Sequence, residues 1–160
     1  MSLGAWLFDT RGAAWKYVLR MVPTTLVPAL LISVLLALLG VAREGTVPTF
    51  DSQLAPAMLF VGLVVISPVG ETLLMAVILK GFSFAIRDRV HLALASALVW
   101  AILHSLAAVA WGLAVFWPFF VFSCAYLAWR EQSRRRGFLV ATSIHMLHNL
   151  LPTLVLLTAL

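Results

Sequence analysis

Residues 90–129, VHLALASALVWAILHSLAAVAWGLAVFWPFFVFSCAYLAW, are an uninterrupted run of 40 residues without a formal charge. A single helix crosses the roughly 30 Å hydrocarbon core of a bilayer with about 20 apolar residues. The run is twice as long as one span requires, so we expect it to fold back as a hairpin of two membrane helices. A glycine and an interfacial tryptophan coincide at Trp111-Gly112, which predicts the turn there.

The composition of the whole chain is also that of a membrane protein. Of its 160 residues, 63% are hydrophobic and only 11% are charged, and the mean hydropathy is +1.06. Soluble domains have about 45 to 50% apolar and about 25% charged residues, so this composition does not supply a water-facing surface. It excludes cytoplasmic enzymes, nucleic-acid-binding proteins and secreted disulfide scaffolds.

Three further charge-poor stretches complete a prediction of five spans. Residues 21–42 carry no charge, residues 52–79 carry only Glu71, and residues 137–160 again carry none. Each stretch is long enough for one helix across the bilayer. The segment 1–17 mixes aromatic and charged side chains, which is typical of a short helix lying at the membrane surface. The sequence therefore predicts an all-α, polytopic membrane protein with one domain over all 160 residues.

Positive charge is divided unevenly between the two sides that five spans define. Ten of the eleven Lys and Arg residues fall on the side of the amino terminus, and only Arg43 falls on the other. Cytoplasmic loops of membrane proteins carry the excess of Lys and Arg. We therefore predict a cytoplasmic amino terminus and an external carboxy terminus. The basic run 130–136 is favoured as a topology anchor, with binding of anionic lipid or a partner as the alternative.

The few ionisable and amide side chains inside the spans fall at one depth. At 1.5 Å per residue, Glu71 lies about 14 Å and His104 about 20 Å from the predicted cytoplasmic ends of their helices. On the same basis His145 and Asn149 lie about 12 and 18 Å along the last helix. Such groups are costly in a bilayer and mark functional sites. We predict that the four meet in one buried site, with Trp100, four residues before His104, shielding that histidine from lipid.

These side chains are the parts needed to hydrolyse a peptide without a covalent intermediate, a metal or a cofactor. A carboxylate that faces imidazoles in an apolar cavity can deprotonate a water, and an imidazole and a carboxamide can donate to an oxyanion. One alternative is that Glu71 and a histidine only neutralise each other. Another is a zinc site made of Glu71, His104, His145 and His148. We expect His148 itself to be structural, bonding across helices and pointing elsewhere, about 100° around the helix from Asn149.

The order and spacing of these residues resemble those of a known family. The segments Ser67-Pro68-Val69-Gly70-Glu71, Trp100-x-x-x-His104 and His145-x-x-x-Asn149 resemble the three motifs of the CPBP intramembrane proteases, also called the ABI domain. That family includes the type II CAAX prenyl endopeptidases and bacteriocin-processing relatives, and the resemblance covers about residues 55–158. It implies that Glu71 is the general base, assisted by His104, and that His145 and Asn149 form the oxyanion site.

Two positions depart from the family pattern. Where the family has a second glutamate and then an arginine, this chain has Thr72 and Ala76. Their paired loss is electrostatically coherent, because a lone buried arginine would be costly. The departures favour an alternative function, that of a catalytically inactive peptide-binding, immunity or assembly factor. A proton-coupled carrier that uses the same polar groups is a third alternative.

The favoured prediction is a metal-independent intramembrane endopeptidase. Its expected partners are a membrane-associated peptide or protein substrate and the lipid bilayer, and no nucleic acid. The resemblance implies the inner (cytoplasmic) membrane of a bacterium.

Overall fold

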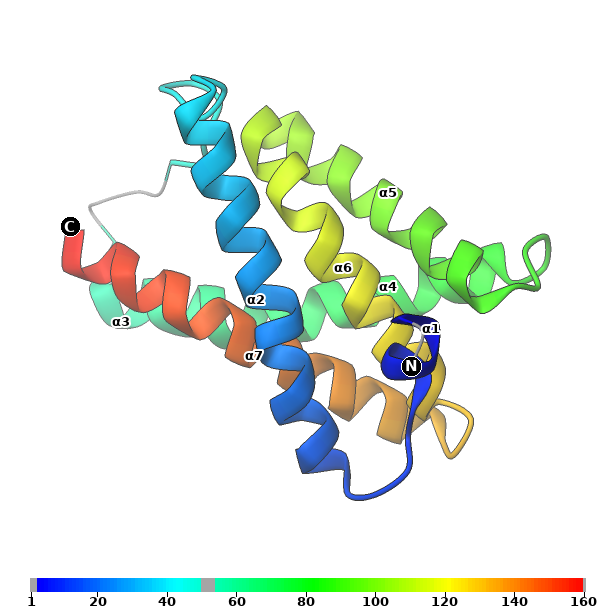
Figure 1. The fold of residues 1–160 in the computed structure, drawn as a ribbon. Coiled ribbons are helices and arrows are strands. Elements are labelled where there is room, and N and C mark those ends of the chain that lie inside the picture. The colour runs from blue at the N-terminus through cyan, green and yellow to red at the C-terminus, as the bar shows by residue number, and fades with distance from the viewer. Residues whose placement is uncertain (1–2, 50–53, 160) are drawn as a thin grey trace.

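The computed structural model describes residues 3–49 and 54–159, and every regular element in these ranges is a helix (Figure 1). In chain order the helices are α1 (Leu3–Phe8), α2 (Ala14–Leu38), α3 (Pro56–Val61), η1 (Gly62–Ile66), α4 (Ser67–Phe82), α5 (Arg89–Ala107), α6 (Val109–Trp129) and α7 (Arg134–Ala159). Helix η1 is a π-helical turn that joins α3 to α4 without a break. The first residues of the second predicted span, 52 and 53, lie outside the described residues.

Within the described residues, five helices are long and apolar enough to cross a membrane. They are Ala14–Leu38, Pro56–Phe82, Arg89–Ala107, Val109–Trp129 and Arg134–Thr158. The chain is therefore an all-α, polytopic membrane protein, as predicted. The first span begins earlier than the predicted charge-free stretch, and α2 therefore includes Lys16 and Arg20. Their long cationic side chains can extend to the membrane interface.

Helix α6 is the centre of the bundle. It contacts α1, α2, α4, α5 and α7, and it is buried over most of its length, unlike the other spanning helices. In Figure 1, α6 lies between α2 and α5, while α7 runs across the lower part of the view. Every residue of α6 from 118 to 129 is buried. A helix that is apolar around its whole circumference suits this position.

The hairpin predicted from residues 90–129 is present, but its turn lies earlier than predicted. Only Ala108, in an extended conformation, separates α5 from α6. Gly112 lies inside α6, where a Cβ atom would approach Ser105 Oγ to 1.9 Å and the Ala101 carbonyl oxygen to 2.4 Å. The glycine therefore permits close contact between two helices instead of forming the turn.

The amino-terminal helix is short and is tied to the bundle. Helix α1 contacts α6, and Leu7 is only 1% exposed. The Tyr17 hydroxyl donates to the Leu7 carbonyl oxygen at 2.6 Å, and Arg20 donates to the Trp6 and Asp9 carbonyl oxygens at 3.1 and 2.9 Å. These bonds satisfy carbonyls at the end of a helix that has no following turn. The predicted surface segment 1–17 thus ends earlier, at the start of α2.

Candidate functional site

The predicted site residues lie around one small cavity inside the bundle. The cavity has a volume of about 80 Å³. Its polar lining comes from three helices, α4, α5 and α7, and it consists of Ser67, Glu71, His104, His145, His148 and Asn149. The structure therefore brings together all four predicted residues, and it adds Ser67 and His148.

Glu71 is held by a residue one turn earlier on α4. The Ser67 hydroxyl donates to Glu71 Oε1, four residues apart on the same helix. The other carboxylate oxygen, Oε2, lies 3.6 Å from His145 Nε2. Ser67 was not predicted as a site residue, although its position four residues before Glu71 places it on the same face of the helix.

Aromatic rings hold His145 on α7. Its ring stacks on Phe122, with centroids 4.4 Å apart, and meets the Phe119 ring edge-on at 5.3 Å. The side chain is buried, and Nδ1 has no hydrogen-bond partner among the described residues. Nε2 is the ring nitrogen that faces Glu71. With its proton on Nε2, the neutral ring directs its N–H toward the Glu71 carboxylate.

His104 is fixed by the backbone of its own helix. Nδ1 lies 2.9 Å from the Trp100 carbonyl oxygen, which only accepts hydrogen bonds, so Nδ1 carries the proton and Nε2 is left as an acceptor. The Trp100 ring lies 5.7 Å from the His104 ring, as the shielding prediction requires. The ring of Trp111 is nearer, at 4.6 Å. The sequence pattern predicts Trp111 at the turn, but its ring covers the site instead.

His148 bonds across helices, as predicted, but it also lines the cavity. The Thr25 hydroxyl donates to the Val22 carbonyl oxygen at 2.8 Å. It therefore accepts from His148 Nδ1, which lies 3.0 Å away. The prediction that His148 points elsewhere is wrong, because His148 and Asn149 line the same cavity, with His145 between them on α7. At about 100° per residue, the three side chains span an arc of only about 100°.

Asn149 is held by the π-helical turn η1. Its Nδ2 donates to the Leu63 carbonyl oxygen at 2.9 Å. In the π pattern the N–H of Ser67 bonds to the Gly62 carbonyl oxygen, five residues back. The next N–H in this pattern would come from Pro68 to Leu63, but proline has none. The Leu63 carbonyl is therefore left without its helical donor, and the Asn149 amide takes that place.

The two positions that depart from the family pattern have different surroundings. Thr72 is 1% exposed, and its hydroxyl has no hydrogen-bond partner among the described residues. A threonine hydroxyl in a helix usually bonds to a carbonyl of the preceding turn, so this residue is under-satisfied. Ala76 does not line the small cavity but a larger one, farther along α4.

The zinc alternative requires at least three of Glu71, His104, His145 and His148 around one ion. Among the residues that the structure describes, no group of three His, Cys, Asp or Glu side chains is arranged to hold a metal ion. His148 instead uses Nδ1 to bond with α2. Comparisons with protein-family models, with curated proteins and with solved structures find no match for this chain.

Proposed function

We propose that this protein is an intramembrane endopeptidase that hydrolyses a peptide bond of a membrane-associated substrate with water activated by Glu71 and His104. The observation that carries the proposal is the convergence of these two residues with His145 and Asn149 on one small cavity inside the bundle. The resemblance of their order to the CPBP motifs supports the same reaction. We extend the proposal to membership of that group of glutamic-type proteases.

The cavity has the size and lining that a reactive water needs. A buried water requires at least about 10 to 15 Å³ and two to four polar partners. About 80 Å³ is available here, beside the Glu71 carboxylate and the His104 imidazole. Because His104 Nδ1 is occupied by the Trp100 carbonyl, Nε2 is the atom that can accept a hydrogen bond from the same water.

The proposed reaction begins when this water attacks the carbonyl carbon of the substrate. A Glu71 oxygen takes one proton from the water as the new C–O bond forms. The carbonyl oxygen becomes an oxyanion, to which Asn149 and His145 donate hydrogen bonds. Glu71 then passes the proton to the nitrogen of the leaving amine, and the C–N bond breaks.

Both proposed oxyanion donors have a hydrogen to spare. The amide nitrogen of Asn149 carries two hydrogens, of which the Leu63 carbonyl uses one. The 3.6 Å between His145 Nε2 and Glu71 Oε2 is too long for a direct hydrogen bond. Nε2–H is therefore free to donate to an oxygen atom that enters the cavity.

A neighbouring cavity supports a membrane-associated substrate. It has a volume of about 180 Å³ and shares Leu63, Trp111 and Asn149 with the small cavity. Its other lining residues are Pro152, Thr153 and Leu156. This mostly apolar lining suits an extended, hydrophobic peptide segment that approaches Asn149 from the side of the bundle.

The test compares cells that express the wild type with cells that express Glu71→Gln. Glutamine keeps the shape of the side chain but does not take the proton of a water. Loss of a positioned base typically lowers turnover about 10² to 10⁴-fold. Mass spectrometry of peptides from the membrane fraction should detect new peptide ends in the wild type that are missing with Glu71→Gln.

The matched control is Glu44→Gln, which removes an exposed carboxylate in the loop after α2. It should give the same peptide ends as the wild type. Both variants should unfold at the wild-type temperature in detergent. Identical peptide ends in all three samples would reject the protease and favour the inactive peptide-binding alternative.

A further inference from the structure

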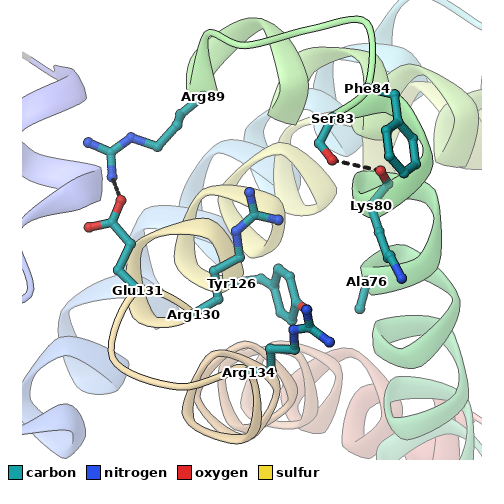
Figure 2. A pocket seen from close by; sticks show the side chains of 9 residues that line it. All are labelled: Ala76, Lys80, Ser83, Phe84, Arg89, Tyr126, Arg130, Glu131 and Arg134. Atoms are coloured by element: carbon teal, nitrogen blue, oxygen red, sulfur yellow. Dashed lines mark hydrogen bonds and ion pairs between the residues drawn. The ribbon is translucent and has the colours of Figure 1, made fainter.

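A second, larger cavity lies where α4 ends, α5 begins and α6 turns into α7 (Figure 2). Its volume is about 480 Å³, which is within the range of small-molecule sites. Ala76 lies on its wall, and none of the six polar residues of the small cavity lines it. The two cavities are therefore separate.

Four cationic side chains line this basic pocket, and only one of them is neutralised. Arg89 forms an ion pair with Glu131, and Figure 2 shows both turned away from the other cations. Lys80, Arg130 and Arg134 have no ion-pair partner among the described residues. The pocket thus has an excess of positive charge that no part of the described chain compensates.

The hydroxyl of a largely buried tyrosine points into the same group of cations. Tyr126 is only 7% exposed, and its hydroxyl makes no hydrogen bond with the described residues. Figure 2 shows Lys80, Arg130 and Arg134 around it. The hydroxyl faces the open space of the pocket, so it is available to donate a hydrogen bond to a bound anion.

Two further features define the anion. Helix α7 begins at Arg134, and the amino terminus of a helix adds partial positive charge that favours phosphate. Phe84 lies on the opposite wall and is 85% exposed. An apolar surface beside a cationic pocket at the end of membrane spans suits a ligand with a charged head and an apolar tail.

We propose that this pocket binds a phosphate group, and that in the membrane the phosphate belongs to the headgroup of an anionic phospholipid. A topology anchor needs cations that flank the spans, but it does not need them gathered around the unpaired hydroxyl of a largely buried tyrosine. The convergence of Lys80, Arg130, Arg134 and Tyr126 on one concave site is explained by a bound ligand.

The test measures binding of phosphatidylglycerol and phosphatidylcholine to the full chain in detergent by native mass spectrometry. The pocket variant is Lys80→Ala with Arg134→Ala. Its matched control, Arg87→Ala with Arg135→Ala, removes two exposed cations that do not line the pocket. One cation near an anionic lipid contributes roughly fivefold in affinity, so the pocket variant should bind phosphatidylglycerol about 30-fold more weakly.

The control variant should change this affinity by no more than about 3-fold, because Arg87 and Arg135 do not line the pocket and act on a ligand there only through screened, longer-range attraction. Equal losses in the two double variants would overturn the proposal, as would equal binding of both lipids to the wild type. Tyr126→Phe keeps the ring and the fold, and it should also weaken phosphatidylglycerol binding. Wild-type affinity in Tyr126→Phe would contradict the role of the hydroxyl.

A titration with inorganic phosphate distinguishes the source of the phosphate group. Weak competition with phosphatidylglycerol supports the lipid headgroup. Inorganic phosphate could instead bind tightly to the wild type and not to Lys80→Ala with Arg134→Ala. This result would support a phosphate site in the pocket, but it would assign the site to free phosphate and reject the lipid.

Discussion

Helix α4 carries residues of two cavities that differ in how their polar groups are satisfied. In the small cavity four of the polar side chains are held by hydrogen bonds, Glu71 by Ser67, His104 and Asn149 by backbone carbonyls, and His148 by Thr25. His145 is held by the rings of Phe119 and Phe122. In the basic pocket three cations and a tyrosine hydroxyl have no partner among the described residues.

The difference indicates two kinds of site. Side chains that are fixed before a substrate arrives do not have to be ordered during the reaction, and this is how an enzyme stabilises a transition state. Unpaired charges around an open space gain their partners only when a ligand binds. We therefore expect substitutions in the small cavity to change turnover, and substitutions in the basic pocket to change affinity for an anion.

The largest effect in the small cavity beyond that of Glu71 is expected for Asn149→Ala. Removing one oxyanion donor typically lowers turnover about 10² to 10³-fold. Turnover would be measured on purified protein with a peptide identified through its dependence on Glu71. His148→Ala is the control, because His148 lines the same cavity but bonds to α2.

His148→Ala should keep most of the turnover at a temperature where the protein remains folded. If His148→Ala is the inactive variant and Asn149→Ala the active one, then the proposed face of α7 is wrong. That result would also weaken the contrast between the two cavities, since a residue with a structural partner would be performing the chemistry.

The fold was largely predictable because the length of charge-free sequence determines how often a chain crosses a bilayer. The turn of the hairpin was not, because the sequence near Gly112 says only that a glycine follows a tryptophan. The need for glycine there comes from Ser105 and Ala101 on the neighbouring helix. Contacts between helices decided that position, and they are not visible in a local pattern.

The site was predictable to the extent that polar groups are costly in a membrane. This cost is enough to identify Glu71 and His145 from the sequence alone. Their supporting partners were not predicted, because no local sequence pattern marks them and only the packing of the helices brings them into contact with the site. Leu63 is an example, since its carbonyl becomes an acceptor only through the π-helical register and the missing N–H of Pro68.

A smaller effect is expected for Pro68→Ala, which tests how Asn149 is held. Alanine restores an N–H that can donate to the Leu63 carbonyl in the π pattern, and Asn149 would then lose its partner. A misplacement of 1 Å can cost about 10²-fold in rate, so we expect a loss of about tenfold for a side chain that is loosened but still present. Thermal stability should be unchanged or higher, because proline inside a helix is unfavourable.

Two controls separate this positioning role from a general effect on folding. Pro23→Ala changes an exposed proline within α2 and should leave turnover unchanged. The double variant Pro68→Ala with Asn149→Ala should be no slower than Asn149→Ala alone, because the two changes act through one side chain. Additive losses would show that Pro68 acts in another way.

The smallest effect is expected at Thr72, which lies on α4 between the residues of the two cavities. Its hydroxyl is buried without a partner among the described residues, and an unsatisfied buried donor costs about 1 to 3 kcal/mol. Valine has nearly the same shape without the hydroxyl, so Thr72→Val should raise the unfolding temperature by about 2 to 12 °C and leave turnover unchanged.

Thr142→Val, at another buried hydroxyl without a described partner, should behave in the same way. A lower unfolding temperature for Thr72→Val alone would mean that its hydroxyl bonds to a carbonyl of its own helix. Thr72 would then be as well satisfied as the residues around Glu71.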